Sequence, residues 1–207
     1  MSHEVMHHPG INLGPAHGEA NEIAKTMLFG FWAFLMSDAI LFGMVFASYV
    51  TSVHATAGGP GPKDLYNIRS AFIETLLLLA SSFTFGMASL ALKYKHSKTR
   101  LVQWLLVTLL LGMAFLGFEV HDFLTMIAKG GTPERSGFIS AFFDLVPLHG
   151  LHVTGGCIWL ICLIGQMARY GIDTQVKLGI LRLALFWHFL DIVWIAIFTI
   201  VYLGGLA

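Results

Sequence analysis

The stretch LGILRLALFWHFLDIVWIAIFTIVYLGG, residues 178–205, decides the fold class of this chain. It carries one arginine and one aspartate among side chains that are mostly apolar. As an α-helix a run of this length extends roughly 40 Å, which exceeds the approximately 30 Å thickness of a bilayer's hydrocarbon core. The stretch therefore predicts a transmembrane helix.

Four similar runs precede it, and each exceeds the approximately 18 residues that a spanning helix needs. They cover about residues 26–53, 67–92, 101–128 and 138–168. The segments between them are short and carry glycine, proline or charge, which is typical of loops. We predict an all-α, polytopic membrane protein: a five-helix transmembrane domain over residues 26–207, after a polar N-terminal tail at 1–25. The tail has no basic start followed by an apolar core, so we do not expect a cleaved signal peptide.

The composition of the 207-residue chain agrees with this fold class. Apolar residues make up 56% and charged residues 12%, against about 25% charged residues in soluble domains. This apolar excess does not fit inside one soluble core, which argues against a soluble enzyme. The 12 Lys and Arg balance the 12 Asp and Glu, so no basic surface is available for nucleic acid. Cys157 and Cys162 lie in one apolar run and are expected to be buried hydrophobes, without a disulfide.

The distribution of basic residues predicts the orientation in the membrane. Eight Lys and Arg lie on the side of the N-terminal tail and four on the other side. Because cytoplasmic loops carry the excess of Lys and Arg, the N-terminus is expected inside and the C-terminus outside.

Small residues at close spacing suggest where the helices pack, because they let backbones approach each other in lipid. The candidates are Ala39, Gly43 and Ala47 in the first run, Ser82 and Gly86 in the second, and Gly155 and Gly156 in the fourth.

Ionisable residues inside the expected spans are the candidates for function. They are Asp38, Glu74, Glu119, His121, Asp144, His149, His152, His188 and Asp191. Each charge at the bilayer centre costs at least about 2.5 to 3.5 kcal/mol, so these side chains are expected to face the bundle. Glu119 and Asp122, near the end of their span, also fit the membrane interface.

Two pairs of these residues stand three positions apart, His149 with His152 and His188 with Asp191, so each pair shares one helical face. These two polar faces are expected to meet. Four interpretations are open for them: hydrogen bonds that join helices or hold a lipid head group, proton conduction, haem ligation by His149 or His152 with His188, and a zinc or copper site. The first is favoured, because it needs no chemistry beyond burial.

Several segments resemble subunit III of the haem-copper terminal oxidases, above all that of the cytochrome bo-type ubiquinol oxidases. They are GFW at 30–32, SDAILF at 37–42, TAGGP at 56–60, RSGF at 135–138, HGLHV at 149–153 and FWHFLDIVW at 186–194. The resemblance runs from Lys25 to near the end of the chain, and five helices match the short form of the family. One departure is Pro147-Leu148, where quinol-oxidase relatives commonly read Gly-Thr; a proline can kink the helix that carries His149.

The resemblance implies an accessory subunit of a proton-pumping ubiquinol oxidase in the bacterial cytoplasmic membrane. The chain itself would hold no catalytic residue, cofactor or metal, because haems and copper belong to the catalytic subunit I on which it packs. Subunits II and IV and phospholipids are further expected partners. Alternatives are subunit III of a cytochrome c oxidase, or a haem-binding membrane cytochrome.

The same resemblance suggests roles for single residues. Asp38 matches a membrane-embedded acid associated with lipid contact and with support of proton uptake. The other candidates for a buried polar site or a lipid site are Glu74, His149, His152, His188 and Asp191.

Overall fold

The computed structural model describes residues 17–56, 58, 61, 66–94, 98–132, 134 and 136–206, and this part of the chain consists of helices and connecting loops, with no strand. The long helices are α1 (His17–Ser52), α3 (Ile68–Lys93), α4 (Lys98–Ala128), α5 (Gly137–Tyr170) and α6 (Thr174–Ile197). A π-helical turn, η2 (Phe198–Leu203), and the short α7 (Gly204–Leu206) follow α6. Five segments are long and apolar enough to cross a membrane, which confirms the predicted fold class.

The ends of the helices follow local capping chemistry. Ser136 accepts a hydrogen bond from the backbone N–H of Ile139, and Asn67 accepts one from that of Arg69, so each caps the helix that it precedes. Gly171 ends α5 with φ at 81°, a conformation that glycine adopts without steric cost. Helix α1 begins nine residues before the expected apolar run, at His17, because a helix can continue in polar sequence beyond the hydrocarbon. Helix α5 continues through Pro147 without a break.

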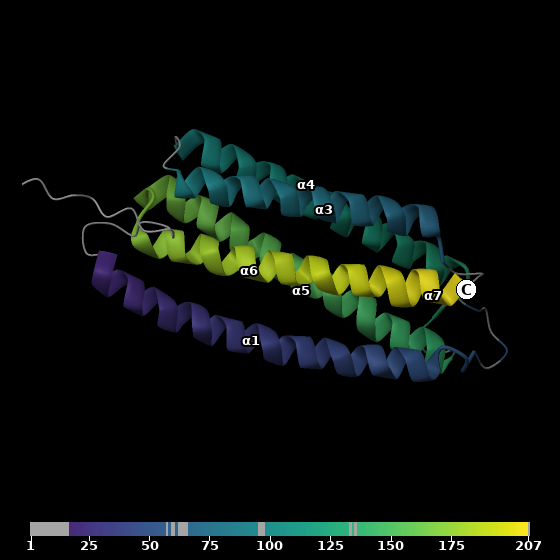
Figure 1. Cartoon of the computed structure of the whole chain (residues 1–207). Coiled ribbons are helices and arrows are strands. Elements are labelled where there is room, and N and C mark those ends of the chain that lie inside the picture. The colour runs from purple at the N-terminus through teal and green to yellow at the C-terminus, as the bar shows by residue number, and fades with distance from the viewer. Residues whose placement is uncertain are drawn as a thin grey trace, which may run out of the picture.

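By their contacts four helices form a ring, and α1 lies along the side of the bundle away from α3 and α4 (Figure 1). Helices α3, α4, α5 and α6 contact one another in that order, and α6 also contacts α3. Helix α1 packs on α5 and α6. The described start of α1 and the C-terminal α7 lie at opposite ends of the bundle, as an odd number of crossings requires (Figure 1).

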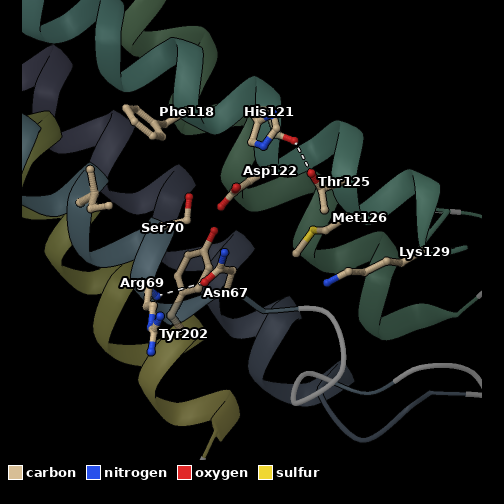
Figure 2. Close-up of a pocket in the computed structure, with 11 residues that line it drawn as sticks. Asn67, Arg69, Ser70, Phe118, His121, Asp122, Thr125, Met126, Lys129 and Tyr202 are labelled. Atoms are coloured by element: carbon tan, nitrogen blue, oxygen red, sulfur yellow. Dashed lines mark hydrogen bonds between the residues drawn. The ribbon is translucent and has the colours of Figure 1, made fainter.

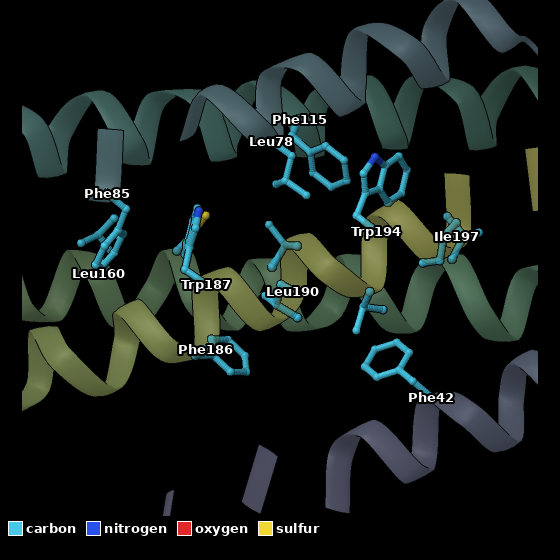
Figure 3. Packing of buried hydrophobic residues seen from close by; sticks show 14 of the residues in the cluster. Phe42, Leu78, Phe85, Phe115, Leu160, Phe186, Trp187, Leu190, Trp194 and Ile197 are labelled. Atoms are coloured by element: carbon cyan, nitrogen blue, oxygen red, sulfur yellow. The ribbon is translucent and has the colours of Figure 1, made fainter. Parts of the chain in front are cut away.

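Two tryptophans of α6 occupy the centre of the ring (Figure 3). Trp187 and Trp194 are each only 1% exposed. The indole N–H of Trp187 donates to Ser81 Oγ at 3.0 Å, and that of Trp194 donates to Thr75 Oγ1 at 3.1 Å. Because both acceptors lie on α3, these bonds fix the register between α3 and α6.

Most of the small residues expected at helix contacts do not make them. Gly43 and Ala47 are exposed, and a Cβ added to Gly43, Gly86 or Gly155 would meet no atom within 4 Å. Gly156 and Ser82 are exceptions. A Cβ added to Gly156 would lie 3.2 Å from the Trp187 ring, and Ser82 hydrogen-bonds to His188 of α6. Helix α1 packs on α5 and α6 through larger side chains instead. The buried positions of that face include Leu35, Asp38, Phe42 and Tyr49.

A pair of tyrosines ties the start of α3 to the end of α1. The hydroxyl oxygens of Tyr49 and Tyr66 are 3.0 Å apart. Tyr66 precedes α3, and burial raises the pKa of its hydroxyl well above the usual 10, so the group stays protonated and neutral.

Candidate functional site

Asp38 of α1 meets His152 of α5 inside the bundle. Asp38 Oδ1 lies 3.3 Å from His152 Nε2, and the two side chains are 8% and 20% exposed. The other ring nitrogen, Nδ1, lies 2.7 Å from the Leu148 carbonyl oxygen. A carbonyl only accepts, so Nδ1 donates there, and the contact between Nε2 and Asp38 must contain one further proton. Wherever that proton resides, the pair as a whole is neutral, which lowers the cost of placing it in a membrane.

The second histidine-carboxylate pair lies at the contact between α6 and α3. His188 Nδ1 is 2.7 Å from Ser82 Oγ and 3.7 Å from Asp191 Oδ2. The Asp191 side chain is 8% exposed, whereas that of His188 is 45% exposed. The prediction that His188 is buried is therefore wrong, because its ring turns toward Ser82 at the edge of the α3–α6 contact. His121 and Asp144 are also exposed.

A third group of ionisable side chains lies at the centre of the ring. Glu74 of α3, Glu119 of α4 and His149 of α5 are at most 4% exposed. Both ring nitrogens of His149 and both carboxyl oxygens of Glu74 lack a hydrogen-bond partner among the described residues. The imidazole of His149 packs against the rings of Trp194 and Phe115, with centroids 5.3 and 5.9 Å away.

Glu119 is buried because Gly150 leaves room for its carboxyl group. A Cβ built on Gly150 would lie 2.6 Å from both carboxyl oxygens of Glu119. The carboxyl group of Glu119 therefore faces the inside of the bundle and packs directly against the backbone of α5. The sequence shows both residues, but it does not show that they meet.

Asp122, one turn further along α4, lines an open pocket of about 300 Å³ between the start of α3 and the end of α4 (Figure 2). Its carboxylate accepts a hydrogen bond from Ser70 and lies within electrostatic range of Lys129. Arg69 and Lys129 lie on opposite sides of the pocket (Figure 2). This pocket was not predicted from the sequence, although the basic residues Arg69 and Lys129, at the start of α3 and the end of α4, are a signal for it.

The His188–Asp191 pair lies apart from the other two groups. Those two groups adjoin, because His149 lies within electrostatic range of His152, which pairs with Asp38. Glu74 lies within electrostatic range of Glu119 and of Asp122. The expected meeting of the two histidine faces does not occur: among the described residues, His188 contacts neither histidine of α5. The described part of the chain also contains no group of three or more His, Cys, Asp or Glu arranged to hold a metal ion.

Comparison with known proteins gives the family. The protein-family model described as cytochrome c oxidase subunit III matches residues 11–206 of this chain. Relatives include the cytochrome bo(3) ubiquinol oxidase subunit 3 of Pseudomonas aeruginosa, 47% identical over 93% of this chain and 92% of the relative, and that of Pseudomonas putida, 44% identical over 99% of both. The quinol oxidase subunit 3 of Bacillus spizizenii is 40% identical over 92% of this chain and 96% of the relative. The chain is a multi-pass membrane protein that belongs to the subunit III family of the haem-copper oxidases.

Proposed function

We propose that this chain is a non-catalytic accessory subunit of a bacterial ubiquinol oxidase, which oxidises quinol, reduces oxygen to water and moves protons outward. The observation that carries the proposal is the identity of 44 to 47% with proteins named ubiquinol oxidase subunit 3, over at least nine-tenths of the chain. Because these relatives are named as quinol oxidase subunits, we favour quinol over cytochrome c as the electron donor of the complex.

The chain would pack on the catalytic subunit I in the cytoplasmic membrane, with subunits II and IV as further neighbours. Haems and copper would belong to the partner. The contacts of the histidines support this division of labour: His152 bonds to Leu148 and Asp38, and the His149 ring lies against two aromatic rings. These imidazoles hold helices together.

The test is purification of the complex through an affinity tag on this chain. We expect haem-bearing oxidase subunits to co-purify, together with quinol-dependent oxygen consumption. The isolated chain should be colourless. A Soret band on the isolated chain that disappears in His188→Ala would instead identify a haem-binding cytochrome.

The pocket beside Asp122 is the place where we propose that a phospholipid head group binds. Arg69 and Lys129 offer two cations to a phosphate, and Asp122 offers a carboxylate to an ammonium group. Ile73 and Phe118, 43% and 40% exposed, line the same pocket and provide an apolar surface for an acyl chain. Because the pocket lies at helix ends, it is at the depth of the head groups.

Mass spectrometry of the purified complex tests this site. Arg69→Gln combined with Lys129→Gln should reduce the phospholipid retained per complex, since both cations are lost. Arg169→Gln, at the opposite end of the bundle, is the control and should retain it. Equal retention in the double variant and the control would exclude the pocket as the lipid site.

A further inference from the structure

Glu74 and Glu119 are two carboxyl groups buried in the centre of the ring without a cation. They are 1% and 4% exposed. Among the described residues neither belongs to an ion pair, and both oxygens of Glu74 and Oε1 of Glu119 have no hydrogen-bond partner. The accessory function proposed above assigns no role to this pair.

Two cross-links fix the register between α3 and α4. Ser70, near the start of α3, donates a hydrogen bond to the carboxylate of Asp122 on α4. Thr84 and Thr108, whose hydroxyl oxygens are 2.8 Å apart, form the second link. The second link lies an equal number of residues from the first on both helices, as antiparallel neighbours require.

This register places the two glutamates at the same level of the bundle. Glu74 stands one turn after Ser70, and Glu119 stands one turn before Asp122. Residues one turn apart share a helical face, so the glutamates lie on the faces by which α3 and α4 meet. They are within electrostatic range of each other.

Two ionised carboxylates at this level would be uncompensated charges among apolar helices. An isolated buried charge costs so much free energy that the group takes up a proton instead, and neighbouring carboxyl groups do not both ionise. The other polar groups at this level bring no positive charge. Neither ring nitrogen of His149 makes a hydrogen bond to a described residue, and Tyr202 of η2 presents a neutral hydroxyl. The pair must therefore hold protons.

Asp122 links this level to the open pocket. It lies one turn nearer the end of α4, lines the pocket and is within electrostatic range of Glu74 (Figure 2). Tyr202 lines the same pocket and is within electrostatic range of all three acids, so the wall of the pocket reaches the buried pair. The basic groups of this region lie around the pocket; they are Arg69, His121 and Lys129.

We propose that Glu74 and Glu119 form a proton-binding site that exchanges protons with water in the pocket through Asp122. In the outward step the O–H bond of a buried carboxyl group breaks and an O–H bond forms on the Asp122 carboxylate, which leaves one negative charge on the pair. Asp122 then gives its proton to water in the pocket, and the reverse steps refill the pair. The site needs only this chain, so it does not depend on the proposed function.

Infrared spectroscopy of the full-length chain tests the proposal. The chain is purified in a maltoside detergent, which has no carbonyl group of its own. A protonated carboxyl group shows a C=O stretching band that an ionised one lacks, and this band moves to lower frequency when deuterium replaces the proton. At neutral pH we expect the double variant Glu74→Gln with Glu119→Gln to lose part of this band. Glu134→Gln removes an exposed loop carboxyl group and is the control, in which the band should keep its area.

Transfer to D₂O tests the route. The band of the pair should shift in the unaltered chain, which shows that its protons reach water. Asp122→Asn should slow this shift by about a hundredfold, the low end of the contribution of a positioned proton-transfer group. Glu134→Gln should not slow it. The asparagine oxygen can still accept from Ser70, so the helix contact is kept.

An unchanged band in a folded double variant would show that the pair holds no proton, and the proposal would fail. A band that stays unshifted in D₂O would overturn the exchange with water, and this measurement on the unaltered chain needs no variant to fold. An equally fast shift in Asp122→Asn would exclude the route through Asp122. Failure of the chain to co-purify with oxidase subunits would end the proposed function and leave these three results as they are.

Discussion

Asp38 and His152 show how a carboxylate is accommodated at membrane depth. Leu148 fixes the direction of the imidazole by accepting from Nδ1, so that Nε2 faces Asp38. The pair as a whole is neutral because the contact between Nε2 and Asp38 holds one proton. The sequence predicts that each must be sheltered, but not that they shelter each other, because the two residues are more than a hundred positions apart in the chain.

Asp38→Asn should therefore be a mild change. The asparagine N–H can donate to Nε2 of a neutral His152, so the contact survives without the carboxylate. In the complex we expect unchanged haem content and initial oxygen reduction, with reduced durability during turnover or lipid retention. His152→Ala should be more severe, lowering stability by about 1 to 3 kcal/mol, because Asp38 loses its partner. Thermal unfolding and oxygen consumption measure both. Immediate loss of oxygen reduction in a fully assembled Asp38→Asn complex would contradict the accessory role.

Gly150 gives a second prediction at the residue scale. Gly150→Ala places a methyl group 2.6 Å from the Glu119 carboxyl oxygens, and the buried carboxyl group has to move. We expect a loss of about 1 to 3 kcal/mol, typical of overpacking, seen as a lower unfolding temperature. Gly155→Ala, five residues further along the same helix, is the control. Its added methyl group would meet no atom within 4 Å, so the unfolding temperature should hardly change.

The double variant Gly150→Ala with Glu119→Ala tests the cause. If the clash with Glu119 is responsible, the two changes should not be additive, and part of the lost stability should return. Additive losses would show that Gly150 is needed for another reason.

At the scale of the helices, α6 is held to α3 by two indole groups. Trp187 and Trp194 lie seven residues apart on one face of α6, and their acceptors Ser81 and Thr75 run in the opposite order along α3, as antiparallel neighbours require. Ser81→Ala and Thr75→Val should each cost about 1 to 3 kcal/mol, because each leaves a buried indole N–H unpaired.

Thr75→Val combined with Trp194→Phe is the informative measurement. Phenylalanine at position 194 has no N–H that needs an acceptor, so Thr75→Val should then lower the stability only a little further. Thermal unfolding should therefore show that the losses of the two single variants are not additive. Ser37→Ala is the control, since Ser37 is exposed and bonds to the carbonyl of Phe34 within its own helix. Equal losses for Ser37→Ala and Ser81→Ala would argue against the indole contacts.

The positions of the helices were predictable, and the faces along which they pack were not. Apolar runs report the length of a span directly, which is why five were found. In a membrane both the buried and the lipid-facing sides of a helix are apolar, so the pattern does not distinguish them. The expectation that Gly43 and Gly155 mark contacts failed for this reason. His188 was expected in the interior by the same reasoning, but its side chain is 45% exposed.

At the scale of the whole molecule, the orientation in the membrane remains a prediction, and it decides which leaflet the pocket beside Asp122 faces. The pocket lies between the first turn of α3 and the last turn of α4, at the same end of the bundle as the C-terminus. With eight basic residues on the side of the N-terminal tail and four on the other, this end is expected outside. Its phospholipid would then come from the outer leaflet of the cytoplasmic membrane.

Alkaline phosphatase fusions measure this orientation, because the enzyme is active only outside the cytoplasm. A fusion to the C-terminus should be active, and a fusion after Tyr94, between α3 and α4, should be inactive. Green fluorescent protein at the same two positions should give the opposite pattern, which controls for expression. An inactive C-terminal phosphatase fusion with fluorescence at that end would place the C-terminus inside. The pocket would then face the inner leaflet, and the excess of basic residues would have to be explained by contacts within the complex.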